Sequence, residues 1–447
     1  MLFSVRYIEF TLTYCVKYGI LLIKKWFNAK GIYIMAVPKA KQYILDYEQL
    51  GFGMFVHWGL YSQLGGGEWI YHMKHMKMSD YAKLKDSFTA EDFDADKLVL
   101  TAKSAGCRYI TLTTRHHEGF SLYDTCGLNN FDAPHSPAGR DLVREFADAC
   151  RRHDIVPFFY HTTLDWYNKD FNENFDRYLE YLRKSVEILC KNYGKIGGLW
   201  FDGNWSKPGA DWKEKELYAT IRKYQPEAVI INNTGISNRG AVGESEIDAV
   251  TFEQDNPVPM NREGMSKYLA AEMCQTVNNH WGIGNYDIDY KSPGELIKNL
   301  CDCRRAGANY LLNIGPEGQG RINLYQQQLF ELIGRWMKCF GEAIYDGRPY
   351  PSSCIGKNFA LKGAGGKYLY LFIYDLGICG DSNVTPDGEF TGNLAFSNIA
   401  DTVRSVEWMD SGESLDFVQK NDMLCVNFTG YEYGKSLIVR VARAEIE

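Results

Sequence analysis

The chain has 447 residues, of which 45% are hydrophobic and 23% are charged, and its formal net charge is −7. This composition excludes a disordered chain and leaves room for one large domain and one smaller domain. The charge also disfavours a nucleic-acid partner, because phosphate binding needs clustered Lys and Arg and no block of five like charges occurs. We therefore expect a neutral partner.

Aromatic residues make up 14% of the chain, with 10 Trp and 30 Tyr. Such a content suits a protein that stacks flat apolar rings against sugars or bases. For any single aromatic residue, ordinary packing in the core is an equal interpretation. The composition alone therefore does not decide among sugar binding, base binding and ordinary packing.

The first 34 residues are apolar but are interrupted by Arg6, Glu9 and Lys17. They therefore match neither a secretory signal nor a membrane span, and no membrane partner is expected. Met35 begins a more ordinary N-terminus, so we hypothesise that residues 1–34 are an N-terminal extension from a misassigned start. The 12 Cys form no CxxC pair, which favours reduced thiols and a cytoplasmic location.

From Gly51 to about Tyr345, short apolar runs alternate with amphipathic stretches, as in βα units around a parallel sheet. Eight candidate strands lie near residues 52, 107, 155, 197, 228, 249, 270 and 310, of which the sixth and seventh show the weakest pattern. Helical periodicity covers 96–104, 140–152, 174–192, 213–224, 293–305 and 325–340. The pattern predicts a (β/α)8-like TIM barrel as the catalytic domain, residues 35–345.

After Tyr345 the pattern changes to alternating apolar and polar residues separated by Gly-rich turns. The stretches KYLYLFIYD, DMLCVNFTG and KSLIVRVARAE are typical of strands, and no strong helix is expected among them. We predict a small C-terminal β-sandwich over residues 346–447.

Polar residues end almost every strand of the predicted barrel, where barrel enzymes hold their reactive groups. All nine histidines lie between His57 and His280. A single histidine is usually a core residue with a satisfied hydrogen bond, but five at strand ends indicate a site. The strand ends are His57, His116 with His117, Tyr160 with His161, Asp202, Asn232 with Asn233, Glu253, Glu272 and Asn313.

Two chemistries fit this ring of residues. In metal-dependent hydrolysis, imidazoles and an aspartate hold Zn²⁺. The sequence disfavours it, because HxH and HExxH motifs are absent and the adjacent His116 and His117 face opposite ways on a regular strand. Glycoside hydrolysis instead needs two carboxylates, with imidazoles, indoles and amides to hold the sugar.

Asp202, in the stretch GGLWFDGNW, is the candidate nucleophile for such a reaction. Trp200 and Phe201 lower the local polarity, and Gly203 leaves room for a sugar. The alternative is that Asp202 only opens the turn after the strand, a common use of Asp-Gly. From these residues alone, both interpretations stay open.

Five blocks in order resemble the retaining α-L-fucosidases, glycoside hydrolase family 29, over about residues 40–345. They are FGMFVHWGLYS, GGGEW, TTRHHEGFSLYDT, LWFDG and LLNIGPEGQG. The resemblance implies a barrel followed by a β-sandwich, no metal or other cofactor, and Asp202 as the residue that forms the covalent fucosyl-enzyme. It also implies that His57, Glu68, Trp69, His116 and His117 hold the fucose hydroxyls, and it places Trp200, a further substrate-binding candidate, beside the nucleophile. We add Tyr160 and Trp281 as substrate-binding candidates, with Trp281 or Phe55 as a niche for the sugar's C6 methyl group.

The general acid/base has two candidates. Glu272, in AAEMCQTV, resembles a family block ending in Glu-Met-Cys, although Ala271 replaces the usual Trp. Glu253, in TFEQDNP, ends the preceding strand. We favour Glu272 and expect its carboxyl about 5–5.5 Å from that of Asp202, as in retaining enzymes.

The predicted function is therefore exo-hydrolysis of terminal α-L-fucosyl residues from oligosaccharides or glycoconjugates by double displacement. The alternatives are an inactive fucose-binding protein and a barrel glycosidase for a related sugar such as an α-L-galactoside. The sequence determines neither the linkage that is cut nor the capacity for transfucosylation. It also leaves the oligomeric state open, so that a homo-oligomer is compatible with it.

Overall fold

A computed structural model describes residues 36–234, 236, 238–378 and 392–447. The predicted N-terminal extension, residues 1–34, lies outside these ranges. Within them no helix is both long and apolar enough to span a membrane. The ten cysteines in these ranges are all free thiols.

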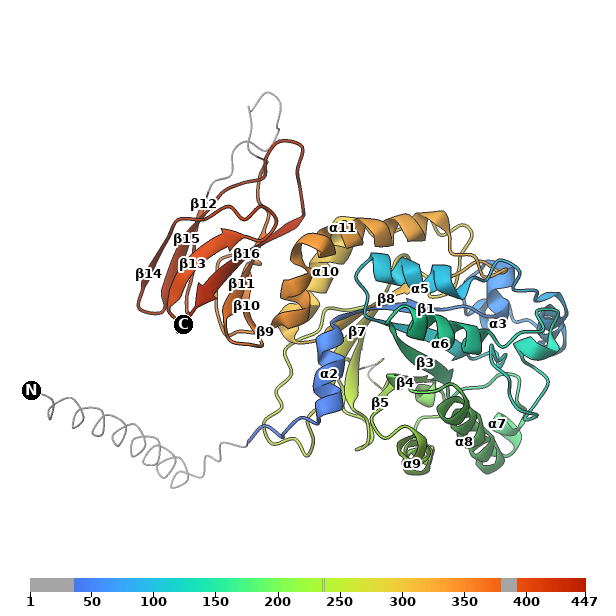
Figure 1. Ribbon diagram of the computed structural model, residues 1–447. Helices are drawn as coiled ribbons and strands as arrows, with labels where there is room; N and C mark the ends of the chain where they lie inside the picture. The colour runs from blue at the N-terminus through green and yellow to red at the C-terminus, as the bar shows by residue number, and fades with distance from the viewer. Residues whose placement is uncertain (1–35, 235, 237, 379–391) are drawn as a thin grey trace, which may run out of the picture. The chain divides into compact units, whose positions relative to one another are not determined.

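Eight parallel strands form a closed barrel in sequence order, with β8 paired to β1 (Figure 1). This confirms all eight predicted strands, including the sixth and seventh. Their short, mostly buried runs suit strands that are covered on both faces. They are β1 (Phe52–Val56), β2 (Tyr109–Arg115), β3 (Val156–Thr162), β4 (Gly198–Asp202), β5 (Val229–Asn232), β6 (Ala249–Glu253), β7 (Ala270–Thr276) and β8 (Asn309–Ile314).

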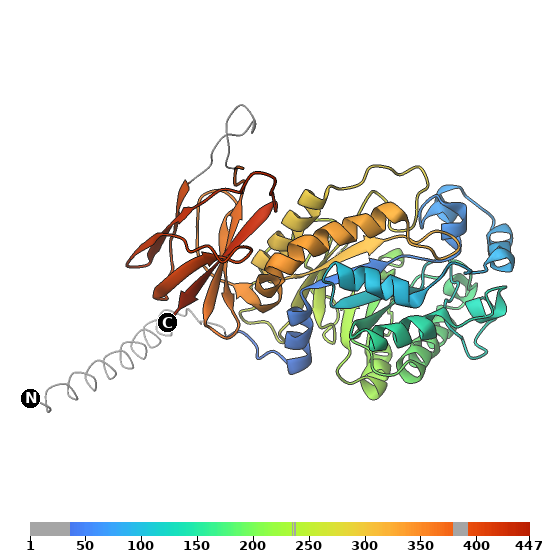
Figure 2. The ribbon, with the colours of Figure 1, turned by 45° about the horizontal axis from the view of Figure 1, so that its top comes forward.

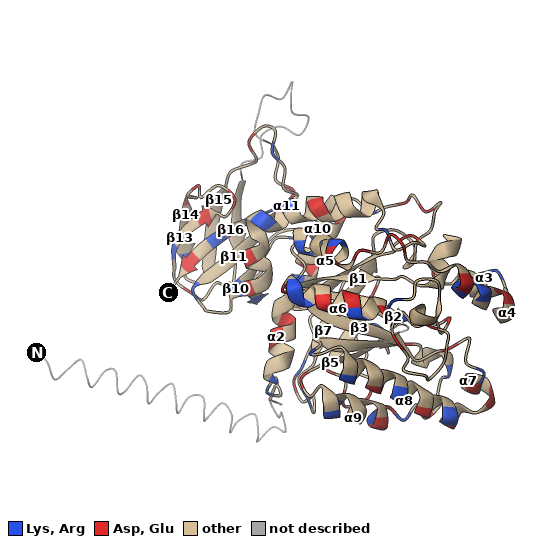
Figure 3. Cartoon of the chain, turned by 45° about the vertical axis from the view of Figure 1, so that its right-hand side comes forward, with Lys and Arg blue, Asp and Glu red and all other residues tan. Residues whose placement is uncertain are grey.

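Helices surround the barrel, and the six predicted ones are present (Figures 1 and 2). They are α5 (Ala95–Ser104), α6 (Leu142–Arg152), α8 (Phe175–Asn192), α9 (Glu214–Tyr224), α10 (Pro293–Ala306) and α11 (Leu324–Asp346). Side chains of Asp94, Asp141, Asn174 and Ser292 accept hydrogen bonds from first-turn N–H groups and so fix where four of these helices begin. Figure 3 shows charges of both signs along the outer helices, whereas the strands of the barrel are almost free of them.

Several short helices are not among the predicted ones. The helix α2 (Gln42–Leu50) precedes β1 and packs against β7 and β5. The others lie in loops and span one or two turns: η1 (Leu60–Leu64), α3 (Ile70–Met73), α4 (Met78–Tyr81), η2 (Ala82–Ser87), η3 (Ala133–His135), α7 (Asp170–Glu173) and η4 (Asn204–Ser206). Such segments are too short to carry a helical period.

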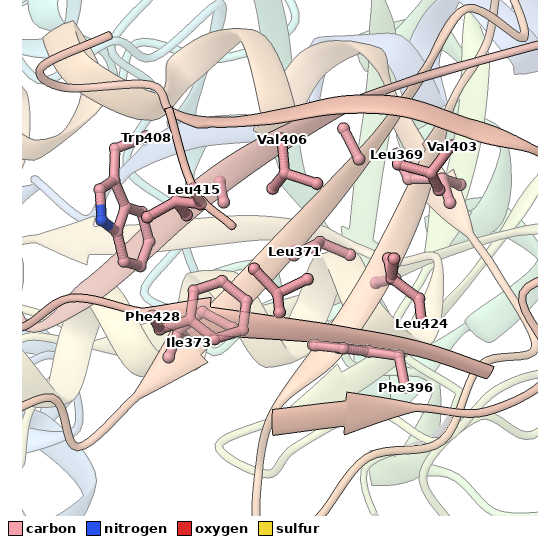
Figure 4. Packing of buried hydrophobic residues seen from close by; sticks show 14 of the residues in the cluster. Leu369, Leu371, Ile373, Phe396, Val403, Val406, Trp408, Leu415, Leu424 and Phe428 are labelled. Atoms are coloured by element: carbon pink, nitrogen blue, oxygen red, sulfur yellow. The ribbon is translucent and has the colours of Figure 1, made fainter. Parts of the chain in front are cut away.

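The C-terminal region contains two antiparallel sheets, in the orders β13-β16-β11-β10-β9 and β12-β15-β14. Their facing side chains form one apolar core, in which Trp408 and Phe428 pack with ring centroids 5.3 Å apart (Figure 4). This is the predicted sandwich. Its strands are β9 (Gly347–Pro349), β10 (Phe359–Gly363), β11 (Tyr368–Tyr374), β12 (Gly392–Phe396), β13 (Val403–Trp408), β14 (Phe417–Lys420), β15 (Met423–Phe428) and β16 (Val439–Ile446).

Candidate active site

A cavity lies at the carboxyl ends of the barrel strands and is lined mostly by aromatic rings, imidazoles and two carboxylates. Most of the predicted site residues line it, whereas Glu68 and Glu272 do not. The lining residues are Phe55, His57, Trp69, His116, His117, Tyr160, Trp200, Asp202, Trp205, Asn233, Ile236, Glu253 and Trp281.

Asp202, the last residue of β4, is held by three polar neighbours besides Asn233 and has a side chain only 14% exposed. Trp205 Nε1 donates to Oδ1 at 2.9 Å, and Tyr160 Oη donates to Oδ2 at 3.2 Å. His117 Nε2 lies 3.5 Å from Oδ2. Burial alone would raise the pKa of Asp202, but the interactions with His117, Trp205 and Tyr160 outweigh it and hold the pKa below its ordinary value. Asp202 is therefore an anion at neutral pH.

Gly203, which follows Asp202, has a structural reason to be glycine. Its φ of +118° is rarely adopted by other residues, and a Cβ would lie 2.6 Å from Leu164 N. The loop after β3 thus packs directly on this turn, and Thr163 N donates to Asp202 O at 2.7 Å. The expected role of Gly203, to leave room for a sugar, is not needed to explain it.

Glu253, the last residue of β6, faces Asp202 across Asn233. Asn233 Nδ2 donates to Glu253 Oε2 at 2.6 Å and to Asp202 Oδ1 at 3.4 Å. Thr251 Oγ1 donates to Asn233 Oδ1, which turns the amide nitrogen toward both carboxylates. Burial and the nearby charge of Asp202 raise the pKa of Glu253 to about 7. One carboxyl is thus held ionised while its neighbour readily keeps a proton.

Glu272 lies elsewhere, in the interior of the barrel below the cavity. It is completely buried and accepts hydrogen bonds from Tyr47 Oη (2.5 Å), Tyr109 Oη (2.6 Å) and Trp200 Nε1 (2.9 Å). In the β6–β7 register it pairs with Thr251, two residues before Glu253, and so lies about 7 Å closer to the amino ends of the strands. The predicted first candidate for the acid/base is therefore enclosed by donors and does not reach the cavity.

Glu68 also lies behind the cavity wall and not in it. Its Oε2 accepts hydrogen bonds from the backbone N–H groups of Trp281 (3.0 Å) and Gly282 (2.8 Å). These bonds hold the loop that presents the Trp281 ring. The contact observed for Glu68 is thus with this loop, and its predicted role as a direct fucose ligand stays a prediction.

Two of the cavity histidines have ring orientations fixed by their neighbours. Asn313 Nδ2 donates to Trp281 O, so Asn313 Oδ1 must accept from His57 Nδ1 at 2.7 Å. Burial lowers the pKa of His57 to about 3, so the ring is neutral and its Nε2 is a hydrogen-bond acceptor. Thr162 Oγ1 donates to Leu164 O, which makes it the acceptor for His117 Nδ1 at 2.7 Å.

Trp205 and Asn233 are the lining residues nearest to the carboxylates that the predicted site lacked. Asn233 was recognised as a strand end, but nothing in the sequence indicated that its amide would bridge two acids. Trp205 lies three residues after the nucleophile candidate in a loop without a periodic pattern. The only sequence signal for Trp205 was its closeness to Asp202 in the chain. The only signal for Asn233 was its position at the polar end of a strand. Over the ranges that the structure describes, no set of three His, Cys, Asp or Glu side chains is arranged to bind a metal ion.

Two carboxylates with opposite pKa shifts, in a cavity of rings and imidazoles on a barrel, define the site of a glycoside hydrolase. Residues 33–342 match the family model described as alpha-L-fucosidase. Tissue alpha-L-fucosidase of Bos taurus is 28% identical over 333 residues, 68% of this chain and 69% of that protein. Among solved structures, alpha-L-fucosidase isoenzyme 1 from Paenibacillus thiaminolyticus is 30% identical, with a TM-score of 0.78 over 91% of this chain and 99% of that one.

A third similar protein, alpha-L-fucosidase from Vibrio sp. strain EJY3, is 26% identical with a TM-score of 0.75, over 91% of this chain and 73% of that one. The chain belongs to the α-L-fucosidase family and is a glycoside hydrolase. The predicted family, the fold class and the enzymatic nature of the chain are thereby confirmed.

Proposed function

We propose that the enzyme is a retaining exo-α-L-fucosidase in which Asp202 is the nucleophile and Glu253, in place of Glu272, is the general acid/base. The observation that carries this proposal is the bridge made by Asn233. One nitrogen lies 3.4 Å from Asp202 Oδ1 and 2.6 Å from Glu253 Oε2, so these oxygens are at most about 6.0 Å apart, the total of the two distances. Retaining enzymes place their carboxyls about 5–5.5 Å apart and inverting enzymes about 6.5–9.5 Å apart.

The charge states suit the two steps of double displacement. Ionised Asp202 attacks C1 of the fucoside while protonated Glu253 gives its proton to the leaving oxygen. The resulting fucosyl-aspartate is then attacked by water, which Glu253, now a carboxylate, deprotonates. Attack on opposite faces in the two steps returns α-L-fucose.

The imidazoles and rings support recognition of a deoxysugar. The bare Nε2 of His57 accepts a hydrogen bond from a sugar hydroxyl, and Trp69 and Trp281 offer flat faces. Phe55 packs against Trp281 with ring centroids 5.8 Å apart, which provides an apolar wall for the C6 methyl group. An α-L-galactoside would place its 6-hydroxyl against such a wall, so we expect a preference for 4-nitrophenyl α-L-fucoside over the matching α-L-galactoside.

Azide distinguishes the two carboxylates by the product that forms. Asp202→Gly should lower kcat roughly 10⁴- to 10⁶-fold, as removal of other hydrolase nucleophiles does. Azide should restore turnover of 4-nitrophenyl α-L-fucoside and yield β-fucosyl azide, because it enters from the face that Asp202 leaves open. With Glu253→Ala, azide should instead attack the fucosyl-enzyme and yield α-fucosyl azide.

Substantial activity of Asp202→Gly without azide would refute the nucleophile. Rescue of Glu272→Ala, and not of Glu253→Ala, with the α product would return the acid/base role to Glu272. The linkage preference is then found by comparing α1,2-, α1,3-, α1,4- and α1,6-linked fucosyl disaccharides.

A further inference from the structure

A second polar cluster adjoins His116, outside the catalytic carboxylate pair. Glu118 is 1% exposed, and neither of its carboxyl oxygens has a hydrogen-bond partner of good geometry among the described residues. The same holds for His116 Nδ1 and for the hydroxyls of Tyr61 and Tyr81. Glu118 Oε2 lies 3.5 Å from His116 Nδ1. Buried polar atoms rarely remain unpaired, so this cluster needs a proton arrangement that satisfies it.

The surroundings of Glu118 favour its neutral form. Burial is the main cause that raises its pKa to about 8, and the backbone N–H groups beside it and Arg115 offset this only in part. Asp165 adds a nearby negative charge, and Tyr61 and Tyr81 remain neutral because burial raises their own pKa values. At neutral pH the carboxyl therefore holds its proton and is a donor.

The Nδ1 atoms of the other two cavity histidines face hydrogen-bond acceptors and not a donor. His57 Nδ1 and His117 Nδ1 both face oxygens that can only accept from them, Asn313 Oδ1 and Thr162 Oγ1. Each of these Nδ1 atoms therefore carries a proton. His116 Nδ1 faces a carboxyl that has a proton to give, and burial keeps the ring of His116 neutral by lowering its pKa well below the ordinary value.

We propose that Glu118, as a carboxylic acid, donates to His116 Nδ1 and so fixes the tautomer whose Nε2–H is a hydrogen-bond donor to a sugar hydroxyl. A small rotation of the carboxyl, or one bridging water that accepts from Glu118 and donates to Nδ1, gives the same tautomer. The proton stays on Glu118, so no bond is broken. Glu118 is thus a positioning residue that makes His116 a donor beside His57, an acceptor. That the acceptor is fucose rests on the proposed function.

The tautomer can be measured in the free enzyme, without substrate. In ¹⁵N spectra of histidine-labelled protein, protonated and bare ring nitrogens are well separated, and His116→Gln assigns the signals of His116. We expect Nε2 of His116 to be protonated and Nδ1 bare, with Nδ1 of His57 protonated as the internal control. A protonated Nδ1 on His116 at neutral pH would overturn the proposal, whatever the substrate is.

Two variants test the consequence for binding. They are Glu118→Gln, whose amide donates without titrating, and Glu118→Leu, which cannot donate. L-Fucose binding is measured by calorimetry in a Glu253→Gln background, which removes the titration of the acid/base. We expect Glu118→Gln to keep the affinity within about threefold, and Glu118→Leu to lose about tenfold, the effect of one hydrogen bond.

The pH dependence separates positioning from packing. With Glu118 present, affinity should fall toward that of Glu118→Leu as pH rises from about 6 to about 9, because the ionised carboxylate would accept from Nδ1 and remove the Nε2 donor. Glu118→Gln should show no such fall. Two results would overturn the proposal. One is an equal L-fucose affinity of the parent and of Glu118→Leu, and the other is an equal loss of affinity in Glu118→Gln and Glu118→Leu. If the parent fails to bind L-fucose, the proposed function fails, while the ¹⁵N spectra still decide the role of Glu118.

Discussion

Glu253 and Glu272 lie on neighbouring strands of one barrel. Glu272 lies two residues closer to the amino ends of the strands than Glu253, and this difference gives the two carboxyls different surroundings. Glu253 ends β6, lines the cavity and receives one side-chain hydrogen bond, from Asn233. Glu272 lies within β7 and receives three, from two tyrosines and Trp200. Both carboxyls have pKa values raised chiefly by burial. Burial alone therefore does not distinguish the proposed general acid, Glu253, from a carboxyl with a structural role.

The neighbours of each carboxyl make the difference. The charge of Asp202 adds to the rise of the Glu253 pKa, which couples the two groups that must differ in protonation. Around Glu272 the hydroxyls and the indole stabilise the carboxylate and tie α2, β2 and β4 to β7. The comparison predicts that Glu253 matters mainly for turnover and Glu272 mainly for stability.

The largest expected effect is on turnover. Glu253→Gln should lower kcat/KM on a fucosyl disaccharide by roughly 10²- to 10⁴-fold, the usual contribution of a general acid/base. The loss should be smaller on an aryl fucoside, whose leaving group needs less protonation. Glu272→Gln is the matched control and should stay within about tenfold of the wild type. Steady-state kinetics on both substrates measure this, and equal losses in the two variants would break the comparison.

The next effect is on stability and has the reverse order. Glu272→Ala leaves three buried donors unpaired and should lower the free energy of unfolding by roughly 2–4 kcal/mol. Glu253→Ala removes a half-buried carboxyl beside another and should change it by less than about 1 kcal/mol. Urea unfolding followed by Trp fluorescence compares them at one pH. A larger loss for Glu253→Ala would contradict the structural role given to Glu272.

The sequence predicted the fold closely because each strand is a short apolar run and most helices carry a capping residue, such as Asp141 or Ser292, at their start. Even AVTFEQ and AAEMCQTV, the runs with the weakest pattern, are strands β6 and β7. The short helix α2 was missed, since nine residues without a side-chain cap give little signal.

For the site, the sequence predicted which residues end the strands but not which of them lie together in the cavity. Motifs pointed to Asp202 and the histidines, but the choice between Glu253 and Glu272 depends on height within the barrel. That height follows from strand register, in which Glu272 pairs with Thr251 and not with Glu253. Register is set by contacts between strands and is not encoded in either strand alone.

The pH profile should sharpen the assignment. In the proposed mechanism Glu253 must be protonated for the first step, and its pKa is about 7, so kcat/KM should fall as pH rises above about 7. Asp202 must be ionised and its pKa lies below the ordinary value, so the acid limb should appear only below about pH 4. Glu253→Gln should lack the alkaline limb, whereas Glu272→Gln should keep both limbs. An alkaline limb that survives Glu253→Gln would assign it to another group.

The smallest expected effect concerns the indoles of Trp205 and Trp200, each of which donates a hydrogen bond to one carboxyl. Trp205 Nε1 donates to Asp202, and Trp200 Nε1 donates to Glu272. Trp205→Phe keeps a ring against Trp69 but removes the donor, so the pKa of Asp202 should rise, the acid limb should move to higher pH, and kcat/KM should fall roughly three- to tenfold. Trp200→Phe is the matched control.

In Trp200→Phe the lost hydrogen bond belongs to Glu272, and the acid limb should therefore stay in place while the free energy of unfolding falls by about 1 kcal/mol. Profiles of kcat/KM against pH and urea unfolding of both variants measure the pair. If Trp200→Phe moved the acid limb as far as Trp205→Phe did, Asp202 and Glu272 would be coupled through the barrel interior. The proposed division, in which Asp202 and Glu253 react at the cavity while Glu272 stabilises the barrel below it, would then not hold.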